Sequence, residues 1–216
     1  MARLAAKRME HDISTGLSEW EGFIDGTGWE NIRISGIGNE RYPNLIGKSL
    51  AEIAEDWGCS PFQAATRLLI EGDLSVSMIV HAMHEEDVTA IMQAPWRMGG
   101  TDALLGGKPH PRSYGSYPRV LGHYVRDLGV ISLEEAIRQM TGAAAKRLRL
   151  VDRGAIETGK WADLVLFDPG SIGDLGTYAE PDRFPSGIAW ILVNGEPVLH
   201  EREPTGNLPG QVLRQR

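Results

Sequence analysis

A change of pattern near residue 150 sets the strongest limit on how this 216-residue chain can fold. Before it, helical stretches alternate with short apolar runs typical of strands, as in an α/β region. After it, GAIETGKWADLVLFDP and GIAWILVNGEPVLHEREP are typical of strand–turn–strand units, and Val193-Asn194-Gly195 is a strong hairpin signal. We therefore expect an α/β region followed by a small all-β piece.

Serine N-caps mark three helix starts in the first region. Ser49 is followed three residues later by Glu52, the pattern of a capping box, and Ser132 has the same relation to Glu135. Ser60 precedes a proline, which suits the first helical turn. We expect helices over SLAEIAEDWG, SPFQAATRLLIEG, HEEDVTAIMQAP and ISLEEAIRQMTGAAAKRLRL, strands over ENIRIS and SVSMIVHAM, and an irregular lead-in over residues 1–28.

Composition excludes several classes of protein. Hydrophobic residues make up 42% of the chain and charged residues 24%, which is ordinary for a soluble globular protein. The net charge of -7 argues against nucleic-acid partners and an anionic membrane surface, and no apolar run is long enough for a signal peptide or a membrane span. Cys59 is the one cysteine, which excludes an intrachain disulfide and favours a cytoplasmic location.

Asp102 is the first candidate catalytic residue. It lies in RMGGTDALLGGKPHPRSYGSYPRVLG (97–122), which we predict to be mostly loop, downstream of a helix that ends before Pro95. A short barrel strand could end there, where a carboxylate faces the substrate loops and can accept a proton from water or bind a divalent cation. The alternative is that Asp102 only caps the next turn.

His110, Arg112 and Tyr114 follow within PHPRSYG and are predicted to bind substrate. The planar guanidinium of Arg112 matches a carboxylate, and His110 could ligate a metal or donate a hydrogen bond. The alternatives are a surface salt bridge for Arg112, as for Arg119, and a loop-bracing role for His110. The motifs GxGxxG, GxxxxGKS/T, HExxH and GxSxG are absent, which argues against nucleotide-binding, zinc-protease and serine-hydrolase sites.

Four stretches of the chain carry a resemblance to a known family. GTDALLGGKPHPRSYGSYPRVLGHYVRD, SLEEAIRQMTGAAAKRLRLVDRGAIETGKWADLVLFDP, ILVNGEPVL and TGNLPGQVLR together resemble the C-terminal half of the D-aminoacylase branch of the amidohydrolase superfamily, which contains N-acyl-D-amino-acid deacylases. The resemblance implies that residues 29–150 form the C-terminal part of a metal-dependent (β/α)8 TIM barrel. Residues 151–216 would form the C-terminal part of a small β-sandwich domain, after the lead-in of residues 1–28.

The resemblance also implies roles for two residues. Asp102 matches the family's aspartate at the end of the last barrel strand, which lies beside zinc, accepts the proton of the metal-bound water and passes it to the leaving amine. Arg112 matches the family's arginine in the HPR loop, which would hold the carboxylate of an N-acyl amino acid. Thr101 and Ala103 stand where the family commonly has serine and glycine, a departure that bears on the substrate.

The zinc ligands that the resemblance implies are missing from this sequence. The family's His-x-His belongs to the first barrel strand, upstream of this segment, and no His-x-His occurs here. Because a catalytic zinc normally takes three protein ligands, Asp102 alone cannot hold it. We therefore expect a split metal-dependent hydrolase of C–N amide bonds, in which a second amidohydrolase subunit carries the N-terminal barrel half and most zinc ligands.

Three alternatives to a split hydrolase remain open. The chain could be a non-catalytic subunit that completes a barrel, or a truncated product of a longer gene. It could also belong to an enzyme that hydrolyses a cyclic amide or imide, or forms one in the reverse reaction. The initial methionine and the plausible lead-in favour a natural subunit over a truncated product.

Overall fold

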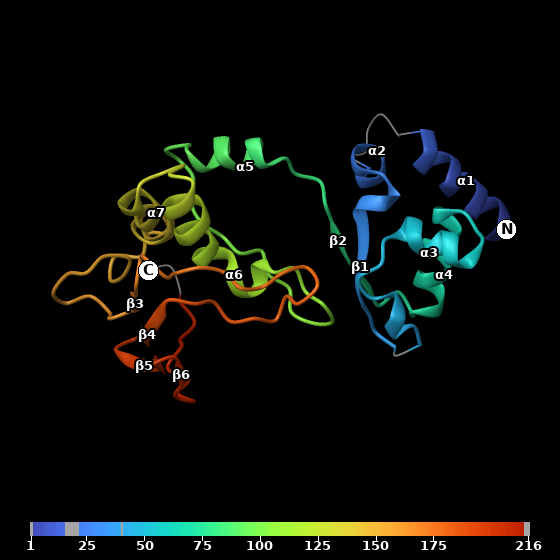
Figure 1. Ribbon diagram of the computed structural model, residues 1–216. Coiled ribbons are helices and arrows are strands. Elements are labelled where there is room, and N and C mark those ends of the chain that lie inside the picture. Colours follow the sequence, from blue (N-terminus) through green and yellow to red (C-terminus); the bar gives the residue numbers. More distant parts are fainter. Residues whose placement is uncertain (1, 16–21, 40, 214–216) are drawn as a thin grey trace. The chain divides into compact units, whose positions relative to one another are not determined.

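The computed structural model describes residues 2–15, 22–39 and 41–213 (Figure 1). These residues belong to two compact units. Unit 1 spans Met1–His84 with Leu104–His110, and unit 2 spans Glu85–Ala103 with Pro111–Arg216. The division at residue 84 differs from the boundaries at 28 and 150 that the resemblance implies, and those domain boundaries stay a prediction.

Unit 1 combines a two-stranded antiparallel sheet with short helices. The strands predicted over ENIRIS and SVSMIVHAM are present as β1 (Ile32–Ile37) and β2 (Val76–Val80), and the structure shows that they pair with each other. The helices of the unit are α1 (Ala2–Thr15), α2 (Phe23–Thr27), η1 (Trp29–Asn31), η2 (Pro43–Leu45), α3 (Leu50–Trp57) and α4 (Pro61–Glu71).

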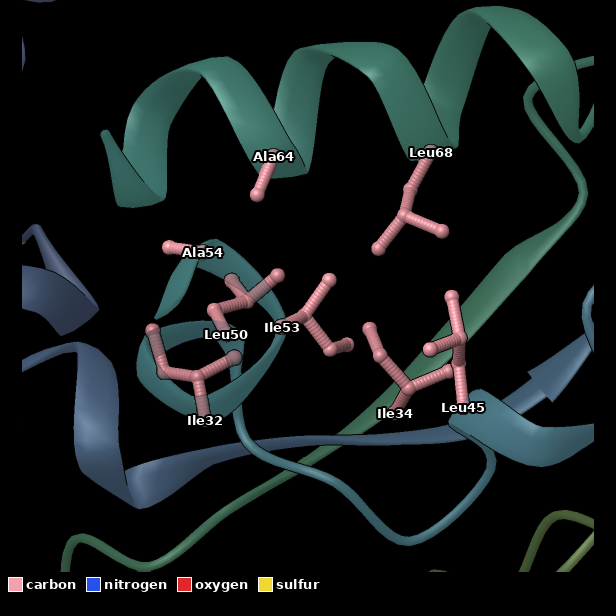
Figure 2. Close-up of a cluster of buried hydrophobic side chains, with 8 residues drawn as sticks. All are labelled: Ile32, Ile34, Leu45, Leu50, Ile53, Ala54, Ala64 and Leu68. Carbon is pink, nitrogen blue, oxygen red and sulfur yellow. The ribbon is translucent and has the colours of Figure 1, made fainter. Parts of the chain in front are cut away.

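The core of unit 1 lies where α3 and α4 meet β1. Figure 2 shows eight buried side chains of this core, from β1, η2, α3 and α4: Ile32, Ile34, Leu45, Leu50, Ile53, Ala54, Ala64 and Leu68. Ile53 and Ala64 are completely buried, and Leu68 is 1% exposed. Leu50, Ile53 and Ala54 follow the three- and four-residue spacing that places side chains on one face of a helix.

The predicted caps hold both helices of this core. The Ser49 hydroxyl accepts a hydrogen bond from the Glu52 amide at 3.1 Å, and the Glu52 carboxylate accepts one from the Ser49 amide at 2.7 Å. Ser60 and Gln63 make the same reciprocal pair at the start of α4, at 3.2 and 3.1 Å. Gly58 ends α3 in the left-handed conformation, with φ of 60°. These local signals were sufficient to place both helix starts.

Unit 2 consists of helices followed by an antiparallel sheet. Its helices are α5 (Glu85–Met92), α6 (Arg112–Arg119), the π-helical η3 (Val120–Asp127), α7 (Leu133–Met140) and α8 (Gly142–Arg147). The strands β3 (Leu164–Phe167), β4 (Ile188–Val193), β5 (Glu196–His200) and β6 (Glu203–Pro204) pair in sequence order. The helical core gathers Met92, Val120, Leu121, Tyr124, Ala136 and Ile172.

The hairpin predicted at Val193-Asn194-Gly195 joins β4 to β5. Asn194 and Gly195 have φ of 52° and 87°, the left-handed values that a type I′ turn requires at both central residues. The first predicted strand unit differs, because GAIETGKWADLVLFDP contributes only β3. All sheet ladders of the described residues are antiparallel. None of the helices in the described ranges is long and apolar enough to cross a membrane.

Two predictions for the helices of unit 2 were wrong. Residues 112–122, which lie in the stretch predicted to be mostly loop, are helical: they form α6 and the first residues of η3. The glycines there serve close packing: a Cβ at Gly115 would lie 2.6 Å from the Asp174 Cβ, and one at Gly122 would lie 2.5 Å from the Ile172 carbonyl oxygen. The single helix predicted over ISLEEAIRQMTGAAAKRLRL is two, because Thr141 leaves helical geometry at φ -127° and ψ -85°.

The irregular lead-in predicted for residues 1–28 is also wrong where the structure describes it. The stretch ARLAAKRMEHDIST forms α1, and FIDGT forms α2. Alanine, leucine, arginine, lysine and methionine have high intrinsic helix propensity, which accounts for α1 without any capping motif. The lead-in was tested only for the apolar run of a signal peptide, and a helix such as α1 has no such run.

Candidate active site

Asp102 and Arg112 meet in unit 2. Arg112 Nη2 donates to Asp102 Oδ2 at 2.8 Å, in an ion pair with side chains that are 40% and 89% exposed, respectively. Because the Asp102 carboxylate faces solvent, the pair is weakly held and its oxygens stay accessible to a ligand. The structure therefore brings together the two residues to which the resemblance gives catalytic and substrate-binding roles.

The backbone at Asp102 is left-handed, with φ of 46°. Aspartate and asparagine adopt this region more readily than other residues with side chains, but it still costs energy. The short barrel strand expected to end there is not formed, and residues 96–105 carry no regular structure. A strand exists only when it pairs with a neighbour, and the described part of the chain offers this segment no strand partner.

A buried glutamine on α7 anchors the segment that leads to Asp102. The Gln139 carbonyl accepts a hydrogen bond from the Gly99 amide at 3.2 Å, and its side-chain oxygen accepts one from Arg97 at 2.5 Å. Gln139 is completely buried, and its amide nitrogen donates to the Met92 carbonyl and to Glu135 at 3.1 and 2.9 Å. The sequence holds one indication of this role: Gln139 stands three positions after Ala136, so a polar side chain lies on the same face of the helix as a buried one.

Arg112 is the first residue of α6, and its own helix supports it. The Ser116 hydroxyl donates to the Arg112 carbonyl at 2.7 Å. Tyr114 lies edge-on to Phe184, with ring centroids 5.8 Å apart and an interplanar angle of 86°. His110 belongs to unit 1 and is half-buried, next to the buried Pro109. The substrate-binding roles of Tyr114 and His110 stay predictions.

Arg119 takes the structural role that the sequence left open. It forms an ion pair with Asp174 at 3.3 Å and lies over the Tyr124 ring at 5.7 Å. Burial raises the pKa of Tyr124, and a hydrogen bond to Glu85 adds to this effect while one to Arg119 opposes it. This cluster fixes the end of α6 against η3, so it supports the helix that carries Arg112.

The residues at hand do not by themselves fit a zinc ion. Within residues 2–15, 22–39 and 41–213 there is no group of three histidine, cysteine, aspartate or glutamate side chains close enough to hold a metal. Catalytic zinc takes three protein ligands and a water, whereas Asp102 contributes one carboxylate that is already paired with Arg112. No chemical step through a metal follows from this chain alone.

We expect acid to weaken the contacts of Gln139, which holds the segment before Asp102, because Gln139 donates a hydrogen bond to the Glu135 carboxylate. Hydrogen bonds from Arg138 and Gln139 lower the pKa of Glu135 from 4.5 to about 2. Because the folded-state pKa is depressed, this carboxylate stabilises the fold above about pH 4.5, and the contribution disappears as the pH falls toward 2. We expect Glu135→Gln to remove that part of the pH dependence of the unfolding free energy, measured by urea denaturation between pH 6 and pH 2.

The matched control for Glu135 is Glu196→Gln, on an exposed position of β5. This variant should keep the pH dependence of the parent chain. Equal pH dependence in the parent chain and in Glu135→Gln would contradict the role of Glu135 in the anchor.

An amidohydrolase is the class of protein to which this fold and site belong. The chain is a member of the amidohydrolase family, whose sequence profile matches residues 46–199. D-aminoacylase from Alcaligenes xylosoxydans xylosoxydans is 41% identical over 173 residues, which are 80% of this chain and 35% of that protein. N-acyl-D-aspartate deacylase from the same organism is 36% identical, over 80% of this chain and 34% of that protein.

Solved structures of the same group superpose well on the chain. The N-acyl-D-glutamate deacylase from Bordetella bronchiseptica, complexed with zinc and a phosphonate inhibitor, has a TM-score of 0.78 at 41% identity, covering 86% of this chain and 38% of that one. A D-aminoacylase mutant in complex with copper chloride has a TM-score of 0.80 at 36% identity, covering 92% of this chain and 40% of that one. These likenesses confirm the predicted resemblance and the α/β fold class of part of an amidohydrolase barrel.

The chain spans about a third of the length of the curated relatives that it matches. The Asp102–Arg112 pair lies within the matched residues, whereas most of each relative has no counterpart in this sequence.

Proposed function

We propose that this chain forms part of the active site of a metal-dependent amidohydrolase that hydrolyses the C–N amide bond of N-acyl amino acids. The observation that carries the proposal is the 2.8 Å pair between Asp102 and Arg112 in a chain that belongs to the amidohydrolase family. Relatives that act on N-acyl-D-glutamate and N-acyl-D-aspartate support this class of substrate.

Asp102 is the proton carrier in this proposal. Its exposed carboxylate accepts a proton from the attacking water and later donates it to the amine that leaves when the C–N bond breaks. Arg112 binds the carboxylate of the substrate. A guanidinium carries five N–H donors in a planar fork, which matches the two oxygens of a carboxylate in a two-point contact.

A second polypeptide supplies the N-terminal barrel half and the zinc ligands. The absence of a three-ligand group in the described residues supports this assignment, as does the zinc in the Bordetella bronchiseptica structure. Large apolar side chains that one soluble unit would normally bury are exposed in unit 2, among them Trp96 at 73%, Phe184 at 75% and Leu166 at 59%. A partner that buries well over about 2,000 Å² would cover such side chains.

Purification of the tagged chain from its own cells tests the proposal. We expect a second, different chain to co-purify, zinc to be present in the pair, and the pair to release free amino acid from N-acyl amino acids. A folded monomer that hydrolyses these substrates by itself would contradict the partner. A zinc-containing pair that leaves every N-acyl amino acid intact would contradict the reaction.

A further inference from the structure

The segment that connects Asp102 to Arg112 has a built docking point in unit 1. Leu104–His110 belongs to that unit, and the Lys108 amide donates to the Ser35 carbonyl of β1 at 2.6 Å. We call Leu104–His110 the strap. Its two ends continue directly into the residues around Asp102 and Arg112 in the sequence.

A β-bulge in β1 prepares the acceptor for the strap. Ile34 pairs with Met78 and Gly36 pairs with Ser77, so the register shifts and Ser35 is the extra residue. A bulge leaves its extra residue out of the ladder. Ser35 is only 6% exposed, and a buried carbonyl needs a donor, which the Lys108 amide supplies. The Ser35 hydroxyl also bonds to the Ser77 hydroxyl at 2.9 Å, which fixes the bulge to β2.

Gly107 allows the strap to approach β1 closely. Its φ is +57°, and a Cβ added there would lie 2.3 Å from the Ser35 carbonyl oxygen and 3.0 Å from the Gly36 Cα. A Cβ at Gly36 would in turn lie 2.8 Å from the Ser77 hydroxyl. Two glycines and a bulge therefore meet at one point, where backbone packs on backbone. A loop that merely passed the strand would need none of these features.

We propose that Gly107 and Lys108 are positioning residues, which set the spacing of Asp102 and Arg112 by holding the strap on the Ser35 bulge. The significance of that spacing rests on the proposed function. When the strap is seated, its two ends keep a fixed separation within unit 1, and Asp102 and Arg112 lie two residues beyond those ends in the sequence. When it leaves the bulge, the seven residues of Leu104–His110 become free, and the pair loses the constraint that holds its two members together.

Gly107→Ala is the test, with Gly58→Ala as its matched control. Both positions are left-handed, with φ of 57° and 60°, but a Cβ at Gly58 meets nothing within 4 Å. The two variants therefore share the backbone strain and differ in the clash. We expect amide hydrogen exchange at Lys108 to accelerate at least about tenfold in Gly107→Ala, because a buried hydrogen bond is lost, and to stay unchanged in Gly58→Ala.

The Arg112 guanidinium reports whether the strap acts on the pair. In nitrogen–proton NMR spectra of the full chain, the Arg112 Nε–Hε signal of Gly107→Ala should move to its position in Asp102→Asn, in which the ion pair is absent. Lys108→Pro removes the donor amide and adds no atom at Gly107, so it should move the same signal in the same direction. Unchanged slow exchange at amides of α4 shows that each variant is folded.

Two results would overturn the proposal. Unchanged exchange at Lys108 in Gly107→Ala would mean that the strap is not seated on the bulge. Faster exchange with an unmoved Arg112 signal would mean that the seat does not control the pair. Neither result depends on turnover, so both are distinct from a failure of the proposed hydrolysis, which the partner and product measurements detect.

Discussion

Asp102→Asn should lower kcat of the assembled enzyme by about 10²- to 10⁴-fold, the usual contribution of a positioned proton carrier. Asparagine has nearly the same shape and also tolerates the left-handed backbone found at Asp102, so folding should be preserved. It cannot accept and return a proton at neutral pH. Turnover of an N-acyl amino acid by the purified complex, together with the amount of partner that co-purifies, measures the effect.

The control for this experiment is Asp127→Asn. Asp127 is also a solvent-exposed aspartate of unit 2 paired with an arginine, at 2.8 Å from Arg126. It should leave kcat unchanged. Full turnover in Asp102→Asn would exclude the catalytic role and support the alternative in which the chain only completes a barrel. Lost turnover with a normal yield of complex would support catalysis.

Arg112→Gln should raise KM by about 10- to 100-fold, because a hydrogen bond to a charged group contributes about 1.5–3 kcal/mol. Glutamine removes the positive charge and keeps an amide donor, so the α6 start should persist. The measurement is steady-state kinetics with an N-acyl amino acid and with an N-acyl amine that lacks the carboxylate. The KM of the variant should rise for the N-acyl amino acid only.

Arg183→Gln serves as the matched control, because Arg183 is another exposed arginine in an ion pair, with Glu180. It should leave both substrates unaffected. An equal rise in KM for the two substrates in Arg112→Gln would show that Arg112 does not bind the carboxylate. A fall in kcat without a change in KM would show that it acts through Asp102.

Local signals in the sequence correctly predicted much of the secondary structure. The capping pair of Ser49 and Glu52 predicted the start of α3, Ser60 with the proline after it predicted the start of α4, and the Asn194-Gly195 turn predicted the β4–β5 hairpin. Ser132 caps α7, but Glu135 does not return the bond, because its carboxylate binds Arg138 and Gln139 instead. A capping motif shows one hydrogen bond that a side chain can make locally, and other residues of the same helix can compete for that side chain.

Glycine was the signal most easily misread. In 112–122, glycine and proline suggested a loop, yet Gly115 and Gly122 lie in helices at points of close approach to residues far along the chain. Gly107 is similar, because the sequence shows a glycine-rich stretch and does not show that Ser35 lies opposite. A glycine needed for its small size and a glycine needed for its conformational freedom look the same in the sequence.

The sequence by itself determined the family resemblance, the two residues of the candidate pair, and the helices and turns with local capping signals. Only the tertiary structure showed that Arg112 reaches Asp102, that Gln139 anchors the preceding segment, and that the strap is seated on a bulge. The physical reason is the range of the interactions involved. Caps and turns join residues within four positions, whereas these contacts join groups ten or more positions apart, which only the folded chain brings together.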